Sequence, residues 1–307
     1  NRPPPRCAGL RLRLNRTSFT RSRTSSTRTS QLEDREPLVS QSVYALNVGR
    51  EGFDRLALVQ KIYGPKSREW LLRSGLRPGM RVLELACGTG AMTRVIADSI
   101  VPGGSLVAVD NSEAQLETAK ASCAGVDGVE FVRADACATG LPEGSFDLVY
   151  FRLLAMHLPD PAGLLRHIRT LLKPGGILVC EEAAIDSTFT DPPYAEQLIL
   201  HEMAAALASD HGSDFNVARR LGSLINEAGF ESLEVSAHMP IYVRGEEKFL
   251  EVASFGEALN HWQSAPIEVI REGREICEDL SRAASDERVV YGLSTMRQFA
   301  AKRPAAA

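Results

Sequence analysis

The sequence predicts an α/β protein in which seven strands form a mostly parallel sheet with helices on both faces. Short apolar runs alternate with helix-length segments between residues 80 and 182, turns containing Gly or Pro separate them, and two further strands follow later. Strand–helix–strand units of this length form right-handed crossovers and parallel sheets. Of the 307 residues, 44% are hydrophobic and 24% charged, which is ordinary for a globular protein. No apolar run is long enough to predict a membrane span.

Residues 1–32 differ from the rest of the chain in charge. They contain eight Arg and no acidic residue, so they carry +8, whereas the remaining chain carries −12. Because this stretch is rich in Arg, Ser and Thr and lacks apolar periodicity, we expect residues 1–35 to be a disordered tail. The same composition is typical of an organelle transit peptide; without import we expect a cytoplasmic protein. The acidic remainder lacks the basic surface that nucleic-acid binding requires.

The elements follow one another in order. Residues 43–76 are expected to form two helices that Gly64-Pro65 separates. The predicted strands of the core are Arg81–Ala86, Leu106–Asp110, Val129–Ala134, Phe146–Phe151 and Ile177–Glu181. Its helices run to about Ser99, over Glu113–Ala121 and over Pro161–Leu172. Later helices are expected at 193–209, 217–228, 246–263 and 266–284, and later strands at Ser232–Met239 and Val289–Phe299. The predicted parts are therefore the tail 1–35, helices in 36–78, a core in 79–183, and further helices with sheet completion in 184–307.

A glycine-rich turn follows the first strand. Glu84 and Ala86 lead directly into Cys87-Gly88-Thr89-Gly90. Small residues let a ligand approach the backbone, and the helix that follows offers free N–H groups at its N-terminus. Asp110 ends the second strand, where a carboxylate can accept hydrogen bonds from both hydroxyls of a ribose.

Two details separate a dinucleotide from another adenosyl ligand. Thr93 stands where a dinucleotide fingerprint needs its third glycine, and Glu84 would repel a pyrophosphate but attract an ammonium group. Asp135-Ala136 ends the third strand, where a carboxylate can accept a bond from an adenine amino group. The pattern therefore favours a cationic adenosyl ligand over NAD.

These residues resemble the class I S-adenosylmethionine-dependent methyltransferases. The segments that carry the resemblance are Glu84-x-Ala86-x-Gly88-x-Gly90, Val109-Asp110-Asn111-Ser112, Arg133-Ala134-Asp135-Ala136, Gly144-Ser145-Phe146-Asp147-Leu148-Val149 and Leu172-Lys173-Pro174-Gly175-Gly176. Ala86 departs from the family, which usually has Gly there, and Gln115 stands where an apolar residue is common. Weaker matches outside the core are similar to the small-molecule subgroup near the ubiquinone- and menaquinone-biosynthesis enzymes. The resemblance implies a Rossmann-like fold with an antiparallel last strand and a helical lid over the substrate, formed here by 40–76, 185–215 and 243–287.

The family resemblance implies S-adenosylmethionine as cofactor and S-adenosylhomocysteine as product. The implied cofactor-binding residues are Glu84, Ala86, Cys87, Gly88, Gly90, Asp110, Asn111, Gln115, Asp135, Ala136, Phe151 and Tyr63. Tyr63, together with Gln60, would reach the cofactor carboxylate. We expect methyl transfer to an O, C or N atom of a small, largely apolar metabolite. A protein methyltransferase, or a domain that binds the cofactor without methylating, remains an alternative, and the oligomeric state is open.

Histidines supply the candidates for a general base. His157 follows the fourth strand at the carboxyl edge of the sheet, where open α/β folds bind ligands, so it is the first candidate for a catalytic base; the alternative is a structural histidine that caps the next helix before Pro159. His201 and His261 lie on the expected lid helices, and Asp210-His211 is either a base with its orienting partner or a polar loop. Three aromatic residues are expected either to line the acceptor site or to pack in the core: Phe151, Tyr194 and Trp262.

Two further motifs predict no chemistry of their own. Asp191-Pro192-Pro193-Tyr194 matches the signature of certain amino-methyltransferases. Here it follows the fifth strand rather than the fourth, so we interpret it as a loop and a helix start. No Cys/His cluster has zinc-site spacing and no acidic cluster follows the fourth strand, so no metal is expected. The six cysteines are interpreted as scattered free thiols.

Overall fold

A computed structural model describes residues 46–48 and 52–305. The expected tail 1–35 and the first part of the expected N-terminal helices lie outside these residues. The helices are α1 Phe53–Arg73, α2 Ala91–Ile100, α3 Glu113–Ser122, α4 Pro161–Leu171, α5 Ala195–Asp210, α6 Leu221–Glu227, α7 Leu250–His261 and α8 Ile267–Ser285. The strands are β1 Arg81–Leu85, β2 Ser105–Asp110, β3 Val129–Arg133, β4 Phe146–Arg152, β5 Leu172–Ala184, β6 Phe189–Asp191, β7 Glu231–His238, β8 Ile241–Tyr242, β9 Val290–Gly292 and β10 Thr295–Lys302.

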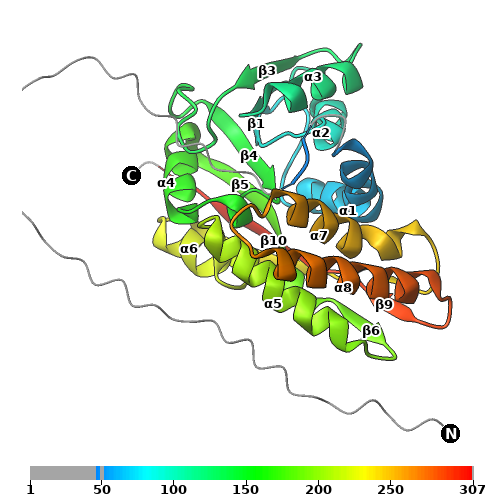
Figure 1. The fold of residues 1–307 in the computed structure, drawn as a ribbon. Coiled ribbons are helices and arrows are strands. Elements are labelled where there is room, and N and C mark those ends of the chain that lie inside the picture. The colour runs from blue at the N-terminus through cyan, green and yellow to red at the C-terminus, as the bar shows by residue number, and fades with distance from the viewer. Residues whose placement is uncertain (1–45, 49–51, 306–307) are drawn as a thin grey trace, which may run out of the picture. The chain divides into compact units, whose positions relative to one another are not determined.

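Seven strands form one sheet in the order β3-β2-β1-β4-β5-β10-β7 (Figure 1). The first five are parallel to their neighbours, and β10 is antiparallel to both β5 and β7. Because parallel strands share a direction, the carboxyl ends of β1 to β5 meet at one edge. The predicted Rossmann-like fold with an antiparallel last strand is confirmed.

Helices cover both faces of the sheet, and each face has its own apolar cluster. On one face α1 and α2 pack through Trp70, Leu71 and Ile96 onto alternate strand residues such as Val82 and Leu148. On the other face α4 and α6 pack onto the intervening positions; this cluster includes Leu83, Leu85, Val149, Phe151, Leu164, Ile168, Leu221 and Ile225. The two-residue alternation along β1 and β4 therefore decides which helix each side chain meets.

Three helices form a layer of their own beside the sheet: α5, α7 and α8, which we call the helical cap (Figure 1). Their facing sides share an apolar cluster that includes Leu200, Met203, Leu207, Phe255, Leu259, Ile276 and Leu280. The prediction of one final strand over Val289–Phe299 is wrong, because this stretch divides into β9 and β10 in different sheets. Strand β9 pairs with β6 and β8 in a small sheet, where the ring of Phe189 packs against Gly292.

Helix α1 is continuous, so the predicted break at Gly64-Pro65 is wrong. Pro65 lies on the exposed side and removes one backbone donor, which costs local stability. The buried side of the helix packs on both sides of this point: Trp70 and Leu71 contact the large sheet, and Val59, Ile62 and Tyr63 share a cluster with residues of α7, β9 and β10. This packing overrides the local penalty. At Gly64 a Cβ atom would lie 2.4 Å from Nε2 of Gln60, so a larger residue there would make that side chain shift.

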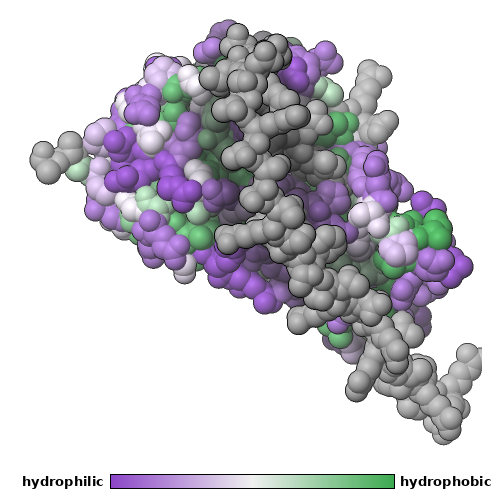
Figure 2. Space-filling model, turned by 60° about the vertical axis from the view of Figure 1, so that its left-hand side comes forward, coloured by the Kyte–Doolittle hydropathy of each residue, from purple (hydrophilic) through white to green (hydrophobic). Residues whose placement is uncertain are grey.

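The outer surface is largely polar. Figure 2 shows one face on which hydrophilic residues predominate and apolar residues occur in separate patches. Across the described residues, no helix combines the length and the apolar character that crossing a membrane would require.

Candidate functional site

The turn after β1 brings backbone amides to the carboxyl edge of the sheet. Ala86, Gly88 and Gly90 all have positive φ values, of 56°, 55° and 81°. The Cys87 N–H donates to Val109 O of β2 at 2.9 Å, which joins the turn to the neighbouring strand. Gly90 begins α2 in close contact with α3, since a Cβ atom there would lie 3.0 Å from the Ala119 Cα. At Gly88 the same construction meets no atom within 4 Å, so this part of the turn faces open space.

Asp110 fixes this turn through its carboxylate. Its Oδ2 accepts a hydrogen bond from the Gly88 N–H at 2.9 Å, and its Oδ1 accepts one from the Ser112 N–H at 2.9 Å. Burial raises the pKa of Asp110, while these amides oppose the increase by favouring the ionised form. Each oxygen keeps a lone pair for another donor. The carboxylate is thus positioned beside the open part of the glycine turn.

Glu84 lies one strand away and is more deeply buried. Only 3% of the residue is exposed, and its Oε2 accepts a 2.6 Å hydrogen bond from the Thr93 hydroxyl. Burial raises its pKa from 4.5 to about 8, against the opposing effects of Thr93 and of the positive charge of Arg152. Glu84 therefore holds a proton for much of the time at neutral pH, and a cation placed beside it would release that proton.

Arg152 brings a positive charge to this edge, and the sequence analysis assigned it no role. It ends β4, and its guanidinium donates to Ser67 Oγ at 3.0 Å and to Gln60 Oε1 at 2.8 Å, both on α1. The signal that could have found it is a charged residue at the carboxyl end of an otherwise apolar strand. Gln60, expected to reach the cofactor carboxylate, thus also helps to orient Arg152.

The remaining predicted cofactor residues divide into exposed and buried sets. Asn111 and Asp135 are exposed at the strand ends, Ala136 is half-buried, and Asp135 Oδ1 accepts from the Cys137 N–H at 2.8 Å. Cys87 and Gln115 are buried beside the turn, where burial raises the pKa of the Cys87 thiol far above its usual range.

Phe151 and Tyr63 lie in the core. Phe151 has no exposed surface and packs in the cluster under α4. The Tyr63 side chain is 3% exposed, and its hydroxyl donates to Ser294 O at 2.8 Å. Both residues therefore pack in the core, which for Phe151 is the alternative that the sequence analysis gave.

His157 lies at the expected edge, in the short 3₁₀ helix η1 (Ala155–His157) that follows β4. Its ring is 5.7 Å from that of Phe215, edge to face. Burial, with a smaller effect from the charge of Arg55, lowers its pKa from 6.5 to about 3. The imidazole is therefore neutral at pH 7, but it is a weak base, because a general base works best with a pKa near the operating pH.

The other candidate histidines are engaged by residues of the helical cap and of the segment before α1. His201 Nε2 is 2.6 Å from Thr188 Oγ1 and 3.3 Å from Glu251 Oε1, inside the helical cap. His261 Nε2 is 2.8 Å from Asn47 Oδ1. Asp210 accepts hydrogen bonds from Trp262 and Ser264 rather than forming one with His211, whose ring lies against Leu207 O. Asp210 and His211 therefore do not form the base-and-orienter pair in this structure.

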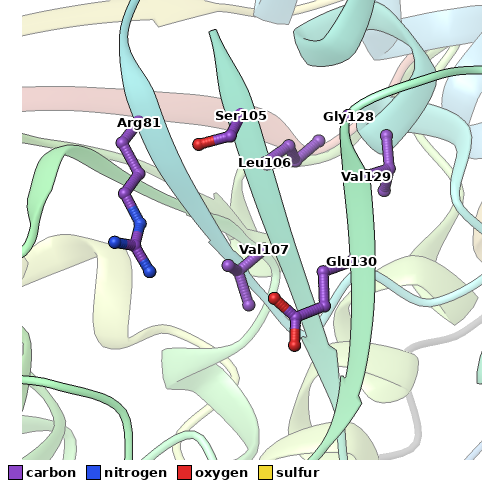
Figure 3. Close-up of a pocket in the computed structure, with 7 residues that line it drawn as sticks. All are labelled: Arg81, Ser105, Leu106, Val107, Gly128, Val129 and Glu130. Atoms are coloured by element: carbon purple, nitrogen blue, oxygen red, sulfur yellow. The ribbon is translucent and has the colours of Figure 1, made fainter.

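The predicted loop at Asp191-Pro192-Pro193-Tyr194 is confirmed, since Asp191 ends β6 and Tyr194 precedes α5. No group of three metal-ligating side chains occurs within the ranges that the structure describes. A shallow pocket of about 380 Å³ lies at the amino ends of β1, β2 and β3, where Figure 3 shows Arg81, Ser105 and Glu130. It lies at the opposite edge of the sheet from the glycine turn and is not the predicted site.

Comparison with known proteins identifies the fold and the family of this site. A family model described as a methyltransferase domain matches residues 83–180. Demethylmenaquinone methyltransferase of Lactococcus lactis is 32% identical over 183 residues, which cover 54% of this chain and 71% of the relative. Relatives of that name from Staphylococcus aureus are 34% identical over 110 residues, less than half of their own length.

Solved structures share the fold at low sequence identity. A Bacillus halodurans protein assigned to the methyltransferases has a TM-score of 0.55 and 20% identity, covering 78% of this chain and all of that one. Phosphoethanolamine N-methyltransferase 2 of Haemonchus contortus, in complex with phosphomonomethylethanolamine and S-adenosylhomocysteine, has a TM-score of 0.53 and 18% identity. That match covers 83% of this chain and 58% of the other.

Proposed function

Because this chain belongs to the class I S-adenosylmethionine-dependent methyltransferases, we propose that its acceptor is a small, largely apolar metabolite, methylated at an O, C or N atom. The observation that carries the proposal is the contact between the turn after β4 and the loop after α5. The Asp214 N–H donates to Met156 O at 3.1 Å, and Ser213 Oγ donates to His157 O at 3.2 Å. An acceptor held at this edge would contact the loop that leads out of the helical cap. This enclosure favours a small-molecule acceptor over a protein acceptor, which would need an open groove.

The residues at the glycine turn fit the cofactor. Asp110 would accept from the ribose hydroxyls, Glu84 would face the ammonium group, and Asp135 would accept from the adenine amino group. Arg152 adds what the sequence analysis lacked: a cation near Glu84 that suits the carboxylate of the same zwitterionic tail. The open space at Gly88 leaves room for a ligand against the backbone.

When bound, S-adenosylmethionine supplies an activated methyl group, and this chain supplies alignment and exclusion of water. His157 would lie beside the acceptor, as a contact rather than as a strong base. Its low pKa favours an acceptor that is already nucleophilic near neutral pH, or that ionises readily, over an alcohol that needs a strong base. The Lactococcus lactis relative is named for demethylmenaquinone, which belongs to the class of apolar acceptors proposed here.

Calorimetric titration with S-adenosylmethionine, S-adenosylhomocysteine and NADH tests the site. We expect binding of the first two and none of the third. Asp110→Ala should weaken cofactor binding more than tenfold, because it removes two charge-assisted bonds worth roughly 1.5–3 kcal/mol each. Asp127→Ala is the matched control, since Asp127 is an exposed carboxylate of a distant loop. Equal affinities in the two variants would contradict the ribose role.

A mass-spectrometric screen of small apolar acceptors then tests the substrate class. We expect a mass increase of one methyl group that depends on the cofactor. Methylation of proteins alone would support the protein methyltransferase alternative. Tight cofactor binding with no transfer to either class would favour the domain that binds without methylating.

A further inference from the structure

The turn that follows β4 contains a strained backbone. Leu153 has a φ of 55°, in the left-handed region that bulky residues rarely adopt. Such a conformation is unfavourable for a residue with a Cβ atom and persists only where the surroundings impose it. The strained residue lies directly between β4 and η1, which carries His157. The orientation of η1 therefore depends on whatever fixes this turn.

The end of β5 fixes it through three consecutive amides. The Leu153 N–H donates to Glu181 O at 2.9 Å. The Leu154 and Ala155 N–H groups both donate to Oε1 of Glu182, at 2.8 and 2.6 Å. Glu182 has no exposed surface. One buried carboxylate oxygen thus satisfies the first free amides of η1, as capping residues do at helix N-termini.

Retaining a carboxylate at this position is costly. Its second oxygen, Oε2, is buried and has no hydrogen-bond partner among the described residues. The pKa of Glu182 is raised from 4.5 to about 8. Burial is the main cause and the charge of Glu181 adds to it, while hydrogen bonds from the amides of Leu154 to Met156 oppose the increase. Arg297 lies opposite on β10, but its guanidinium donates to Ala218 O. An apolar side chain would avoid this cost and would leave the turn without its acceptor.

We propose that Glu182 is a positioning residue for methyl transfer: its Oε1 holds the strained turn after β4 and thereby presents His157 to the acceptor. This inference rests on the proposed function, because it places the acceptor beside η1. It assigns Glu182 no contact with the substrate. The opposite side of the same turn is held by Ser213 and Asp214, so η1 is fixed between β5 and the loop after α5.

Two substitutions separate hydrogen bonding from bulk. Glu182→Gln keeps an oxygen that accepts from both amides, whereas Glu182→Met fills the space without an acceptor. The readout is the NMR titration of the His157 imidazole, assigned by its loss in His157→Gln. In the wild-type protein and in Glu182→Gln, His157 should stay neutral from about pH 5 to about pH 9. In Glu182→Met, the freed turn should expose the ring, and its pKa should rise into that interval.

Glu181→Gln is the matched control. Glu181 is equally buried on the same strand but faces the other side, where it accepts from Tyr150, Ser67 and Gln298. This variant should lower the melting temperature without changing the His157 titration. An unchanged titration in Glu182→Met, or the same change in Glu182→Gln as in Glu182→Met, would overturn the proposal.

Kinetics complete the test once an acceptor is in hand. Glu182→Met should lower kcat about tenfold or more, as expected for a misplaced contact, with cofactor affinity within about twofold of wild type. Glu182→Gln, which keeps an acceptor oxygen, should have a kcat close to that of the wild-type protein. The NMR readout needs no acceptor, so the two proposals can fail separately. Absence of methyl transfer by the wild-type protein would contradict the proposed function. A His157 titration that is unchanged in Glu182→Met would contradict the positioning role.

Discussion

The glycine-turn edge of the sheet and the helical cap both depend on buried carboxylates, but their partners lie at different distances along the chain. At the edge, Glu84 binds Thr93 nine residues away, and Asp110 binds Gly88 and Ser112 within 22 residues. In the cap, Glu251 of α7 binds groups 40 to 63 residues away. The residues of the first arrangement all belong to one short segment of the sequence. The second exists only once four elements have packed together.

The cap is therefore held by a polar network as well as by its apolar cluster. Glu251 accepts hydrogen bonds from Thr188 at 2.8 Å, from Gln197 at 3.1 Å and from Tyr291 at 2.8 Å. A second buried pair, Arg55–Glu257 at 2.8 Å, joins α1 to α7. Fully satisfied networks of this kind rigidify a structure, and their loss leaves several buried donors without partners. The comparison thus predicts that cap carboxylates determine stability and edge carboxylates determine ligand binding.

The largest effect should follow from Glu251→Ala. Removing this carboxylate leaves the donors of Gln197 and Tyr291 without the acceptor they share, so the free energy of unfolding should fall by about 3 kcal/mol. Urea denaturation measures it, with Glu268→Ala, an exposed residue of α8, as the control. Cofactor affinity should stay within about twofold of wild type. A loss of affinity as large as the loss of stability would show that the two regions are not independent.

Glu84→Gln should change the pH dependence of stability and binding. The pKa of Glu84 is about 8 in the folded protein and 4.5 as its ordinary value, so between these pH values the folded state binds more protons. Stability from this group is therefore complete below pH 4.5 and is lost as pH rises to about 8, by at most roughly 1.4 kcal/mol per pH unit. Glu182 contributes a similar slope. Glu84→Gln should remove about half of the combined slope.

The same residue should link cofactor binding to proton release. An ammonium group beside Glu84 favours its ionised form, so binding at pH 7 should release a proton, and affinity should rise by up to about tenfold per pH unit below pH 8. Calorimetry in buffers of different ionisation enthalpy measures the release, and Glu84→Gln should abolish it. Proton release that persists in Glu84→Gln would mean that Glu84 does not face the ammonium group.

The difference between the two regions also explains what the sequence could predict. The strand–helix alternation and the glycine turn were enough to place Glu84 and Asp110 at one edge. Local patterns predict that β1 and β2 are parallel neighbours, so their carboxyl ends lie together. Arg152 could have been noticed as a charge at the end of an apolar strand, but its partners on α1, like the contact of Glu182 with η1, are not encoded in a local pattern. For the same reason the break expected at Gly64-Pro65 was wrong: packing of α1 on the sheet outweighed a local signal.

Two glycines of the turn separate packing from ligand contact within the edge region. Gly90→Ala adds a Cβ atom 3.0 Å from the Ala119 Cα at a φ of 81°, so clash and strain together should cost about 2 kcal/mol of stability. Gly88→Ala meets no atom within 4 Å, so strain alone should cost about 1 kcal/mol. Because Gly88 faces open space beside Asp110, its substitution should weaken cofactor binding more than it lowers stability. Identical profiles for the two variants in thermal unfolding and calorimetry would remove the distinction.

The smallest effect is expected from Ala86→Gly, which tests whether this edge stores strain. Ala86 has a φ of 56°, which costs a residue with a Cβ atom about 1–2 kcal/mol. Glycine removes that cost but adds about 0.5–1 kcal/mol of chain entropy to the unfolded state, so the net gain in stability should lie between about 0 and about 1.5 kcal/mol. Leu153→Gly, at a φ of 55°, is the contrasting variant: its side chain packs against two apolar clusters, so the lost contacts should exceed the strain relieved. A rise in melting temperature for Ala86→Gly would show that the glycine turn stores strain, and a fall for Leu153→Gly would show that the packing of Leu153 outweighs the strain in the turn after β4.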